Sequence, residues 1–463
     1  MSDMKEYSLP VPVKPPAEIE SLELPVPPGL DETALKEDEL VLFVGPQHGG
    51  SGHMRLIVRV HGDVIREVIP DPGFVHRGME KLAENRLYIQ NIPLLERPAI
   101  MDCINFSLGY VRAIEKALDI EVPERARYIR TMMAEICRIG THLYDAGILA
   151  VFLGHTTGFM WPFALRELTC EALMRVSGAR ITASYVVPGG VRRDVDRGTL
   201  NYINQAMTYI QHKLKDFERV FITNPVTIAR MKDVAVLSKK EAIKYGLVGP
   251  FLRASGVEYD VRAIEPYDAY DELTWDVIVA DDGDSYSRFL VRANEIQQSI
   301  SIIRQCVKAL KEMPEGNIIS ADVAGKKKAA KKPAKKPKEQ ESQGNPTNNP
   351  GNPGGDKEAA NKENAKEKEE KKGLDSIKGA FFRTFGRMTL PRGEYTTLTE
   401  ASRGTVLYTI VSDGQSNAPY RLRMVTPGWF YLKGFMESLK GCRLADLQAV
   451  YGSFGYFPPE ADR

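Results

Sequence analysis

Short runs of apolar residues near the start of the chain have the length and composition typical of β-strands. Three such runs are ELVLFVG from Glu39, MRLIVRV from Met54 and DVIREVIP from Asp63, all rich in Val, Ile and Leu. The last two flank His61-Gly62-Asp63, which predicts a hairpin with a glycine-containing turn. A small antiparallel sheet is therefore expected to open the fold.

The middle of the chain changes to longer segments with helical periodicity, separated by Gly and Pro. These patterns predict helices over about 75–85, 99–118, 123–153, 163–176 and 199–221. A helix over 285–313 is expected from one apolar stripe, formed by Phe289, Ile296, Ile300, Ile303, Val307 and Leu310. Strands return in TVLYTIVSD and PYRLRMVT. The pattern predicts an α+β fold with an N-terminal antiparallel sheet, a central helical bundle and a C-terminal strand-rich part.

Two segments lack the residues of a core. Residues 1–38 are rich in Pro and Glu, which favours an extended arm lying on a neighbouring protein. Residues 321–373 form a Lys/Pro/Asn-rich insertion with no Leu, Ile, Val, Phe, Tyr or Trp after Gly325 until its end, so it is expected to be disordered. Its Lys block could contact anionic lipid or RNA, but a solvated linker is favoured. Residues 39–320 and 374–463 are then the two parts of one domain.

Composition excludes several kinds of partner. Lys plus Arg number 62 and Asp plus Glu 61, so no overall basic field favours nucleic acid or an anionic membrane. No run of about 18 apolar residues is present, and the opening residues lack a signal core. Five widely spaced cysteines form no CxxC pair and suit reduced, buried thiols. If the protein works at a membrane, we expect other subunits to carry it there.

Three segments contain candidate functional residues. The first is GPQHGGSGHMRL, residues 45–56, where His48 and His53 lie in a Gly-rich loop between two strands. A phosphate-binding loop would lead into a helix, so this role is excluded, and two solvated turn histidines are the simplest interpretation of the loop alone. The second is FVHRGMEKLAENRLYIQN, residues 74–91, which carries charged residues in and just after one short helix. A solvated amphipathic helix is the simplest interpretation, and it is kept for Lys81 and Glu84.

The third segment is the predicted helix over 123–153. Glu135, Arg138 and His142 lie at i, i+3 and i+7 and so share one face of a mostly apolar helix. Buried charge is costly unless it is paired, which indicates a polar site inside the bundle. A purely structural network and a functional site remain equally open on this pattern.

Together with YVVPGGVRRDV, LRASGVEYDVR, TEASRG and the terminal ADR, these segments resemble the quinone-site (49 kDa or D-type) subunit of complex I, NADH-quinone oxidoreductase, and its archaeal relatives. This family is related to the large subunits of nickel–iron hydrogenases. The resemblance covers nearly the whole chain apart from the first 40 or so residues and the insertion, and it implies a hydrogenase-large-subunit-like fold.

The resemblance implies roles for five residues. It places His53 and Tyr88 at the quinone head group, where a histidine titrating near pH ~6.5 and a phenol near ~10 can bind the carbonyls and supply protons. It places Arg86, Arg138 and His142 near a [4Fe-4S] cluster held by a partner subunit, where positive or donor groups raise the potential.

Nickel is not expected. In the hydrogenase relatives two CxxC pairs hold nickel and iron, and the matching positions here are Ala99, Asp102, Phe457 and Glu460. None is a thiolate, and Cys103 is one position out of register, so an active hydrogenase is rejected.

Two departures from the family pattern concern the pocket. The loop is one residue shorter than the family's GPQHPxxHG, which displaces His53, and Phe152 stands where relatives often carry an Asp that pairs with this histidine. The quinone bound here is then expected to be a different or less polar one.

The expected function is quinone reduction coupled to proton translocation, in a peripheral subunit on the cytoplasmic face of the membrane. Its partners would be a cluster-bearing small subunit and other peripheral-arm and membrane subunits. The alternative is a non-catalytic structural subunit of a related ferredoxin- or deazaflavin-dependent membrane oxidoreductase. No dinucleotide fingerprint is present to decide the electron donor, for which NADH is the family's usual choice.

Overall fold

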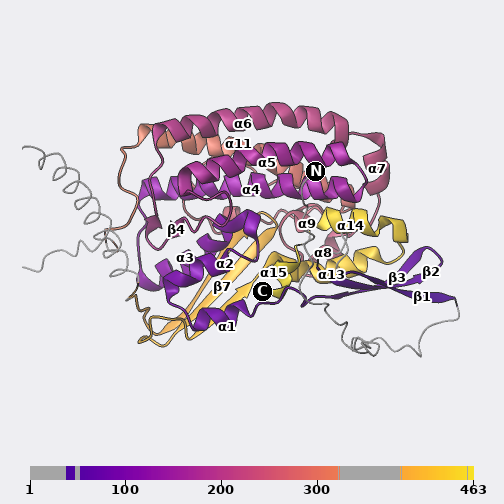
Figure 1. The fold of residues 1–463 in the computed structure, drawn as a ribbon, viewed down its shortest axis with the longest axis horizontal. Coiled ribbons are helices and arrows are strands. Elements are labelled where there is room, and N and C mark those ends of the chain that lie inside the picture. The colour runs from indigo at the N-terminus through magenta and orange to yellow at the C-terminus, as the bar shows by residue number, and fades with distance from the viewer. Residues whose placement is uncertain (1–37, 47–52, 322, 324–385, 387, 456) are drawn as a thin grey trace, which may run out of the picture.

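The computed structural model describes residues 38–46, 53–321, 323, 386, 388–455 and 457–463 (Figure 1). Residues 1–37 of the N-terminal arm, the loop residue His48 and all of the insertion except residues 321 and 323 lie outside the described residues, and the predicted domain boundaries stay predictions.

The predicted N-terminal sheet is confirmed. It is antiparallel in the order β1-β2-β3, and the strands are β1 (Glu39–Val44), β2 (Arg55–His61) and β3 (Val64–Asp71). The β2–β3 turn contains Gly62 in a left-handed conformation (φ 61°), which glycine adopts without steric cost. Strand β2 begins at Arg55, so the Gly-rich loop leads into a strand. A phosphate-binding loop would lead into a helix, and this role was excluded for that reason.

A bundle of long helices forms the centre, as predicted. Helices α4, α5, α6 and α11 lie roughly along one another, and α4 packs on both α5 and α11 (Figure 1). Side-chain caps fix two of the helix starts, because Asp196 accepts from Thr199 N and Asp284 from Ser287 N. All six residues of the predicted apolar stripe on α11 are buried. The bounds are α3 (Cys103–Leu118), α4 (Glu124–Phe152), α5 (Thr156–Ser177), α6 (Arg197–Phe217) and α11 (Ser285–Glu312).

The C-terminal part contains the expected strands together with elements that the pattern did not reveal. The antiparallel sheet has the order β6-β7-β8, formed by β6 (Gly393–Ala401), β7 (Gly404–Ser412) and β8 (Arg421–Val425). It packs on α3 through β6 and β7. Strand β6 was not predicted, nor were α13 (Pro427–Leu439), α14 (Leu447–Phe454) and α15 (Pro458–Asp462).

Short helices complete the architecture. The first predicted helix is confirmed only in part, because Gly78 is left-handed (φ 59°) and the helix begins after it. These elements are α1 (Met79–Glu84), α2 (Asn91–Leu95), α7 (Pro225–Met231), α8 (Lys239–Lys244), α9 (Gly249–Arg253) and α10 (Val261–Ile264), with the two-residue strands β4 (Val186–Val187) and β5 (Gly190–Val191).

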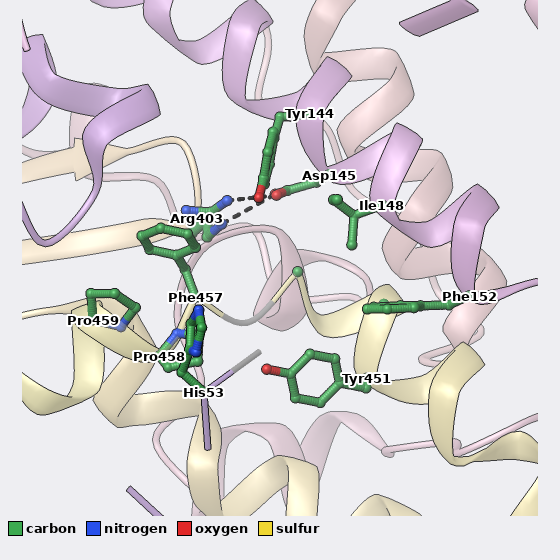
Figure 2. A pocket seen from close by; sticks show the side chains of 12 residues that line it. His53, Tyr144, Asp145, Ile148, Phe152, Arg403, Tyr451, Phe457, Pro458 and Pro459 are labelled. Carbon is green, nitrogen blue, oxygen red and sulfur yellow. Dashed lines mark hydrogen bonds and ion pairs between the residues drawn. The ribbon is translucent and has the colours of Figure 1, made fainter. Parts of the chain in front are cut away.

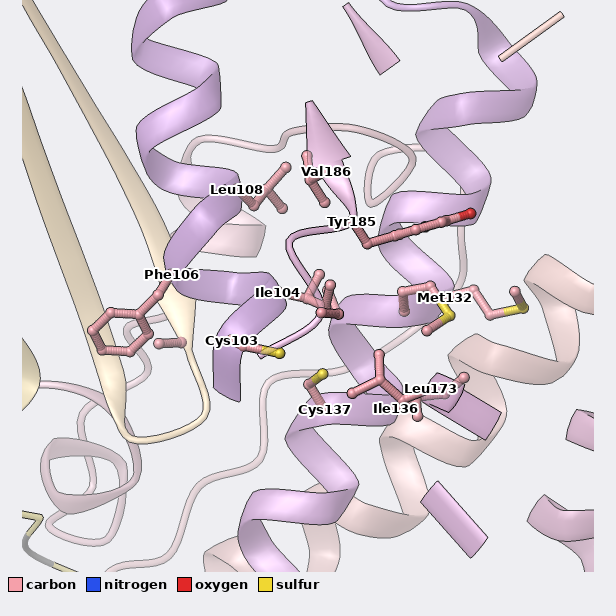
Figure 3. Packing of buried hydrophobic residues seen from close by; sticks show 14 of the residues in the cluster. Cys103, Ile104, Phe106, Leu108, Met132, Ile136, Cys137, Leu173, Tyr185 and Val186 are labelled. Atoms are coloured by element: carbon pink, nitrogen blue, oxygen red, sulfur yellow. The ribbon is translucent and has the colours of Figure 1, made fainter. Parts of the chain in front are cut away.

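Two hydrophobic cores hold the chain together. The larger lies among α3, α4, α5, α6, α11 and the C-terminal sheet, and the smaller lies between the N-terminal sheet, α9, α13 and α14. Figure 3 shows Cys103 of α3 and Cys137 of α4 with their sulfur atoms toward one another in the larger core. All five cysteines are free, and only Cys442 is partly exposed. The polar site described next lies where the two cores meet.

Candidate functional site

A cavity of about 360 Å³ lies between α4, α14 and α15, beside the loop that precedes β2 (Figure 2). Its walls are mostly aromatic and aliphatic, with few polar groups, which is the usual character of a small-molecule site. The lining residues are His53, Tyr144, Asp145, Ile148, Phe152, Arg403, Tyr451, Gly452, Gly455, Phe457, Pro458 and Pro459.

The polar group of the cavity is an arginine between two carboxylates. Arg403 donates to both oxygens of Asp145, at 2.6 and 3.2 Å, and to Glu460 at 2.7 Å. All three side chains are buried. Arg403 lies in the turn between β6 and β7, and Gly249 packs so closely on this turn that an added Cβ would come within 2.5 Å of the Arg403 carbonyl oxygen. This packing fixes the backbone of the turn, and the two ion pairs hold the guanidinium in place.

His53 is one of the residues that line the cavity, and its role at a quinone head group stays a prediction. It is exposed and has a left-handed backbone (φ 72°), just after the loop residues that the structure does not describe. Figure 2 shows its ring beside Phe457 and Pro458, and the Tyr451 hydroxyl points toward this side of the cavity. Phe152, which stands where relatives often carry an Asp, lines the same cavity. The carboxylate of this cavity comes from Asp145, two helical turns earlier on α4.

The four positions that match hydrogenase nickel ligands do not fit a nickel–iron centre. Glu460 is paired with Arg403, and Asp102 accepts from the backbone N of Ser402 at 2.6 Å. Phe457 and Ala99 offer no donor atom. A site without a thiolate is chemically unsuited to nickel and iron. Among the described residues, no group of three or more His, Cys, Asp or Glu side chains is arranged to hold a metal ion.

The polar face predicted on the long helix is real and fully buried. Arg138 donates to Glu135 at 3.1 Å and to the backbone oxygens of Ala401 and Glu400. Glu135 also accepts from Arg262 at 3.0 Å and from the Tyr270 hydroxyl. Although burial opposes ionisation, Arg138 and Arg262 lower the pKa of Glu135 to about 2.

The same network extends to His142, which lies one turn before Asp145. The His142 ring Nε2 lies 2.8 Å from Glu295, and Glu295 accepts from Arg253 at 2.7 Å. Burial lowers the pKa of His142, although Glu295 acts in the opposite direction. Arg253 also donates to Glu400, which lies near the end of β6, three residues before Arg403. The network thus approaches the cavity from inside the bundle.

Tyr88 and Arg86 lie apart from the cavity lining. Tyr88 is buried in the larger core, where its backbone carbonyl oxygen accepts a hydrogen bond from the Tyr110 hydroxyl at 2.9 Å. Burial raises the pKa of the Tyr88 phenol. Arg86 is exposed. The structure therefore brings His53 to the cavity and Arg138 and His142 into the network, but it does not bring Tyr88 beside His53.

The C-terminal residues join the segments quoted from the sequence. The Asp462 carboxylate accepts hydrogen bonds from Gly73 N and Val75 N. The backbone carbonyl oxygen of Asp462 lies 2.5 Å from Nδ1 of the His76 ring. Arg463 pairs with Glu80 at 3.3 Å. The segment HRGMEK is therefore attached to α15, which carries Glu460 toward the cavity.

Sequence reasoning did not single out Asp145, Arg403 or Glu460 as functional. Asp145 follows His142 at i+3 on the same helix face, which was the available signal. Arg403 stood in the quoted TEASRG segment, and Glu460 was considered only as a missing nickel ligand. Their meeting depends on contacts between residues more than 250 positions apart in the chain.

Comparisons with known proteins give a consistent family. Residues 153–463 match the family described as the 49 kDa subunit of the respiratory-chain NADH dehydrogenase. The second D-type subunit of the NADH-quinone oxidoreductase of Rhizobium meliloti (strain 1021) is 34% identical over 431 residues, which cover 93% of this chain and 97% of that protein. The mitochondrial NADH-ubiquinone oxidoreductase 49 kDa subunit of Neurospora crassa is 35% identical, over 95% of this chain and 83% of the relative.

A solved structure is similar over the same length. It is a chain of the membrane-bound sulfane sulfur reductase, described as an archaeal respiratory membrane complex. The identity is 31% and the TM-score 0.76, and the match covers 93% of this chain and 100% of that chain. Within the described residues, no helix combines the length and apolar character needed to cross a bilayer.

Proposed function

Since the chain belongs to the 49 kDa subunit family of the respiratory-chain NADH dehydrogenase, and is thus a subunit of a complex I-type oxidoreductase, we propose that its cavity receives the head group of a quinone. The electrons would come from a [4Fe-4S] cluster in a small partner subunit, and the reduction would be coupled to proton translocation by membrane subunits. The protein would lie peripherally on the cytoplasmic face of that complex.

The observation that carries this proposal is the composition of the cavity. A quinone head group is a flat, largely apolar ring with two carbonyl acceptors, and it needs two electrons and two protons to become a hydroquinone. Phe152, Tyr451 and Phe457 offer ring surfaces, while His53 offers a donor at one side. Arg403 with its carboxylates offers fixed charge at the other side, where negative charge would develop on reduction.

Arg86, Arg138 and His142 are proposed to act on the partner's cluster. Arg86 is exposed and could approach a partner surface directly. Arg138 and His142 are buried, so their effect would reach the cluster through the field of the network, which low dielectric strengthens.

The test replaces the proposed donor. In the assembled complex, His53→Ala should raise the apparent KM for a short-chain ubiquinone about fivefold, since one hydrogen bond contributes about 1 kcal/mol. If the ring also supplies a proton, the rate should fall by a further ~100-fold. His61→Ala is the matched control, because His61 is exposed at the end of β2 and does not line the cavity. Equal quinone kinetics in both variants would contradict the proposal.

A second candidate acceptor follows from the full-length match to the sulfane sulfur reductase chain. In that case the cavity would receive a chain of sulfur atoms, and the family fold would serve a different reduction. The assembled complex, supplied with electrons by a reduced viologen, should then reduce polysulfide and leave ubiquinone and menaquinone analogues unreduced. Quinone reduction without polysulfide reduction would reject this candidate.

A further inference from the structure

Asp145, Arg403 and Glu460 form an ion-paired set beside the cavity that carries one net negative charge when all three are ionised. Arg403 is the bridge between Asp145 and Glu460, and one guanidinium cannot neutralise two carboxylates. Asp145 lines the cavity, whereas Glu460 lies behind Arg403 with 1% of its surface exposed. Arg292 lies near Asp145 and compensates part of its charge, so Glu460 is left with the weaker compensation in a buried place, which is costly unless a proton binds there.

Glu460 is the carboxylate that is poorly solvated. Its Oε1 accepts from Arg403, but its Oε2 is buried without a hydrogen-bond partner among the described residues. An oxygen of an ionised carboxylate is normally held by donors, so an oxygen with none can take up a proton without losing a hydrogen bond.

The charged and titratable groups around Glu460 come from several elements. Arg403 of the β6–β7 turn favours the ionised form, while Asp145 of α4 and Asp102 before α3 oppose it. Tyr431 of α13 faces the same group, and Arg292 of α11 lies next to Asp145. Burial, the largest effect, raises the pKa of Glu460 to about 7.

On the basis of the proposed function, we propose that Glu460 takes up one proton when the head group in the cavity is reduced. The Asp145–Arg403–Glu460 group then changes from one net negative charge to neutrality. Glu460 does not line the cavity and acts through Arg403, so it is a positioning and charge-compensating residue and does not touch the substrate.

The direction follows from electrostatics. Electrons from the partner's cluster add negative charge to the bound quinone, and a nearby like charge raises the pKa of a carboxyl. Glu460 therefore gains a proton from solvent at its Oε2 as the head group becomes anionic. When the head group has taken up its own two protons and leaves as hydroquinone, the pKa of Glu460 falls back and this proton is released. Glu460 takes up and releases one proton in each cycle, so the quinone still needs its own two electrons and two protons to become hydroquinone.

The experiment measures the carboxyl directly in the assembled complex. Duroquinone is bound and reduced with electrons from a reduced viologen, and an infrared difference spectrum is recorded between the oxidised and reduced states. The parent should gain the C=O stretching band of a protonated carboxylic acid on reduction, and Glu460→Gln should lack this band. Glu460→Asp keeps a carboxyl and should restore a band at a shifted position.

Glu96→Gln is the matched control. Glu96 is also buried, with a pKa that burial likewise raises to about 7, but it accepts from Ser184 away from the cavity. Its variant should keep the redox-linked band. If Glu460→Gln does not assemble, the shifted band of Glu460→Asp alone supports the proposal, and an unshifted band overturns it.

The pH profile separates this inference from the proposed function. In the parent, the rate of duroquinone reduction should fall as the pH rises through about 7, by at most tenfold per unit, and in Glu460→Gln this dependence should disappear. If the parent reduces duroquinone and Glu460→Gln keeps both the band and the pH profile, only the inference fails. If the parent complex neither binds nor reduces any quinone, the proposed function fails as well.

Discussion

Single residues determine which chemistry this fold can support. At two of the positions matched to hydrogenase ligands, Glu460 is paired with Arg403 and Phe457 is an aromatic ring, and a mostly apolar cavity with one arginine in its lining lies beside them. Phe152 and Asp145 both line this cavity from α4. The cavity that His53 lines therefore still contains an acid, which pairs with Arg403.

Tyr88 gives the sharpest prediction for a single residue. Tyr88→Phe keeps the ring and its packing in the larger core, so the complex should assemble. If the hydroxyl binds and protonates the quinone, reduction should fall by ~100-fold or more, because a hydrogen bond and a positioned proton donor are both lost. Reduction of an artificial acceptor upstream of the quinone should be unchanged.

Unchanged quinone reduction in Tyr88→Phe would show that Tyr88 does not bind the quinone. The described structure leaves Tyr88 buried and outside the cavity lining. Parental rate and apparent KM in Tyr88→Phe would show that this tyrosine serves the core, and that the phenol at the head group is another one, with Tyr144 and Tyr451 as the cavity's own candidates.

At the scale of elements, α4 connects the buried network with the cavity. Its face carries Glu135, Arg138 and His142 and ends in Asp145. This is the part of the site that the sequence could predict, because helical periodicity alone places these residues on one face. The partners could not be predicted, since Arg262, Glu295 and the β6–β7 turn come from distant segments whose meeting depends on the packing of the whole chain.

Glu135→Gln tests how much this network stabilises the protein. The change leaves Arg138 and Arg262 without their shared carboxylate in a buried place, which should destabilise the fold by about 3 kcal/mol or more. The thermal midpoint of the assembled complex should fall accordingly. Glu171→Gln breaks a more exposed pair with Arg175 on α5 and should change stability by less than about 1 kcal/mol.

The sign of the pH dependence is fixed by the lowered pKa of Glu135. A carboxyl whose pKa falls on folding stabilises the native state above its unfolded value of 4.5, and this stabilisation is lost as the pH falls toward about 2. The difference between parent and Glu135→Gln should therefore be constant from about pH 8 to about pH 5 and become smaller below that. A difference that instead grows in acid would show that the pKa of Glu135 is raised.

At the scale of the whole molecule, the N-terminal sheet, the central bundle and two of the C-terminal strands could be predicted, but the packing that joins the C-terminal part to them could not. Alternating and helical patterns identified the N-terminal sheet and the bundle. They missed β6, whose outer half-exposed residues lack a clear alternation, and α13 to α15, which are rich in aromatic residues, Gly and Pro. The missed α14 and α15 supply Tyr451 and Glu460, and Arg403 lies in the turn that follows the missed β6, so the cavity became visible only in the structure.

Nickel content tests the relation to the hydrogenase fold. The intact complex should contain no stoichiometric nickel by elemental analysis, because Asp102 and Glu460 are engaged with Ser402 N and Arg403 and no thiolate is available at the four matching positions. The control is iron, which partner clusters should supply in the same sample. Nickel at one atom per chain would contradict this interpretation of the four positions.

The last prediction concerns the insertion, which lies outside the described residues. Deleting residues 326–371 removes a stretch without Leu, Ile, Val, Phe, Tyr or Trp, so no apolar burial is lost and assembly and turnover should stay within about twofold of the parent. The loop between the two parts of the domain also becomes shorter, which lowers its closure entropy and should leave the thermal midpoint unchanged or slightly higher. A deletion of the same length that removes β6 and β7 is the control, because these strands pack on α3 and carry Arg403, and the complex should then not assemble. If deletion of 326–371 alone prevents assembly, the insertion binds a partner subunit, and its lysines would be the first residues to replace.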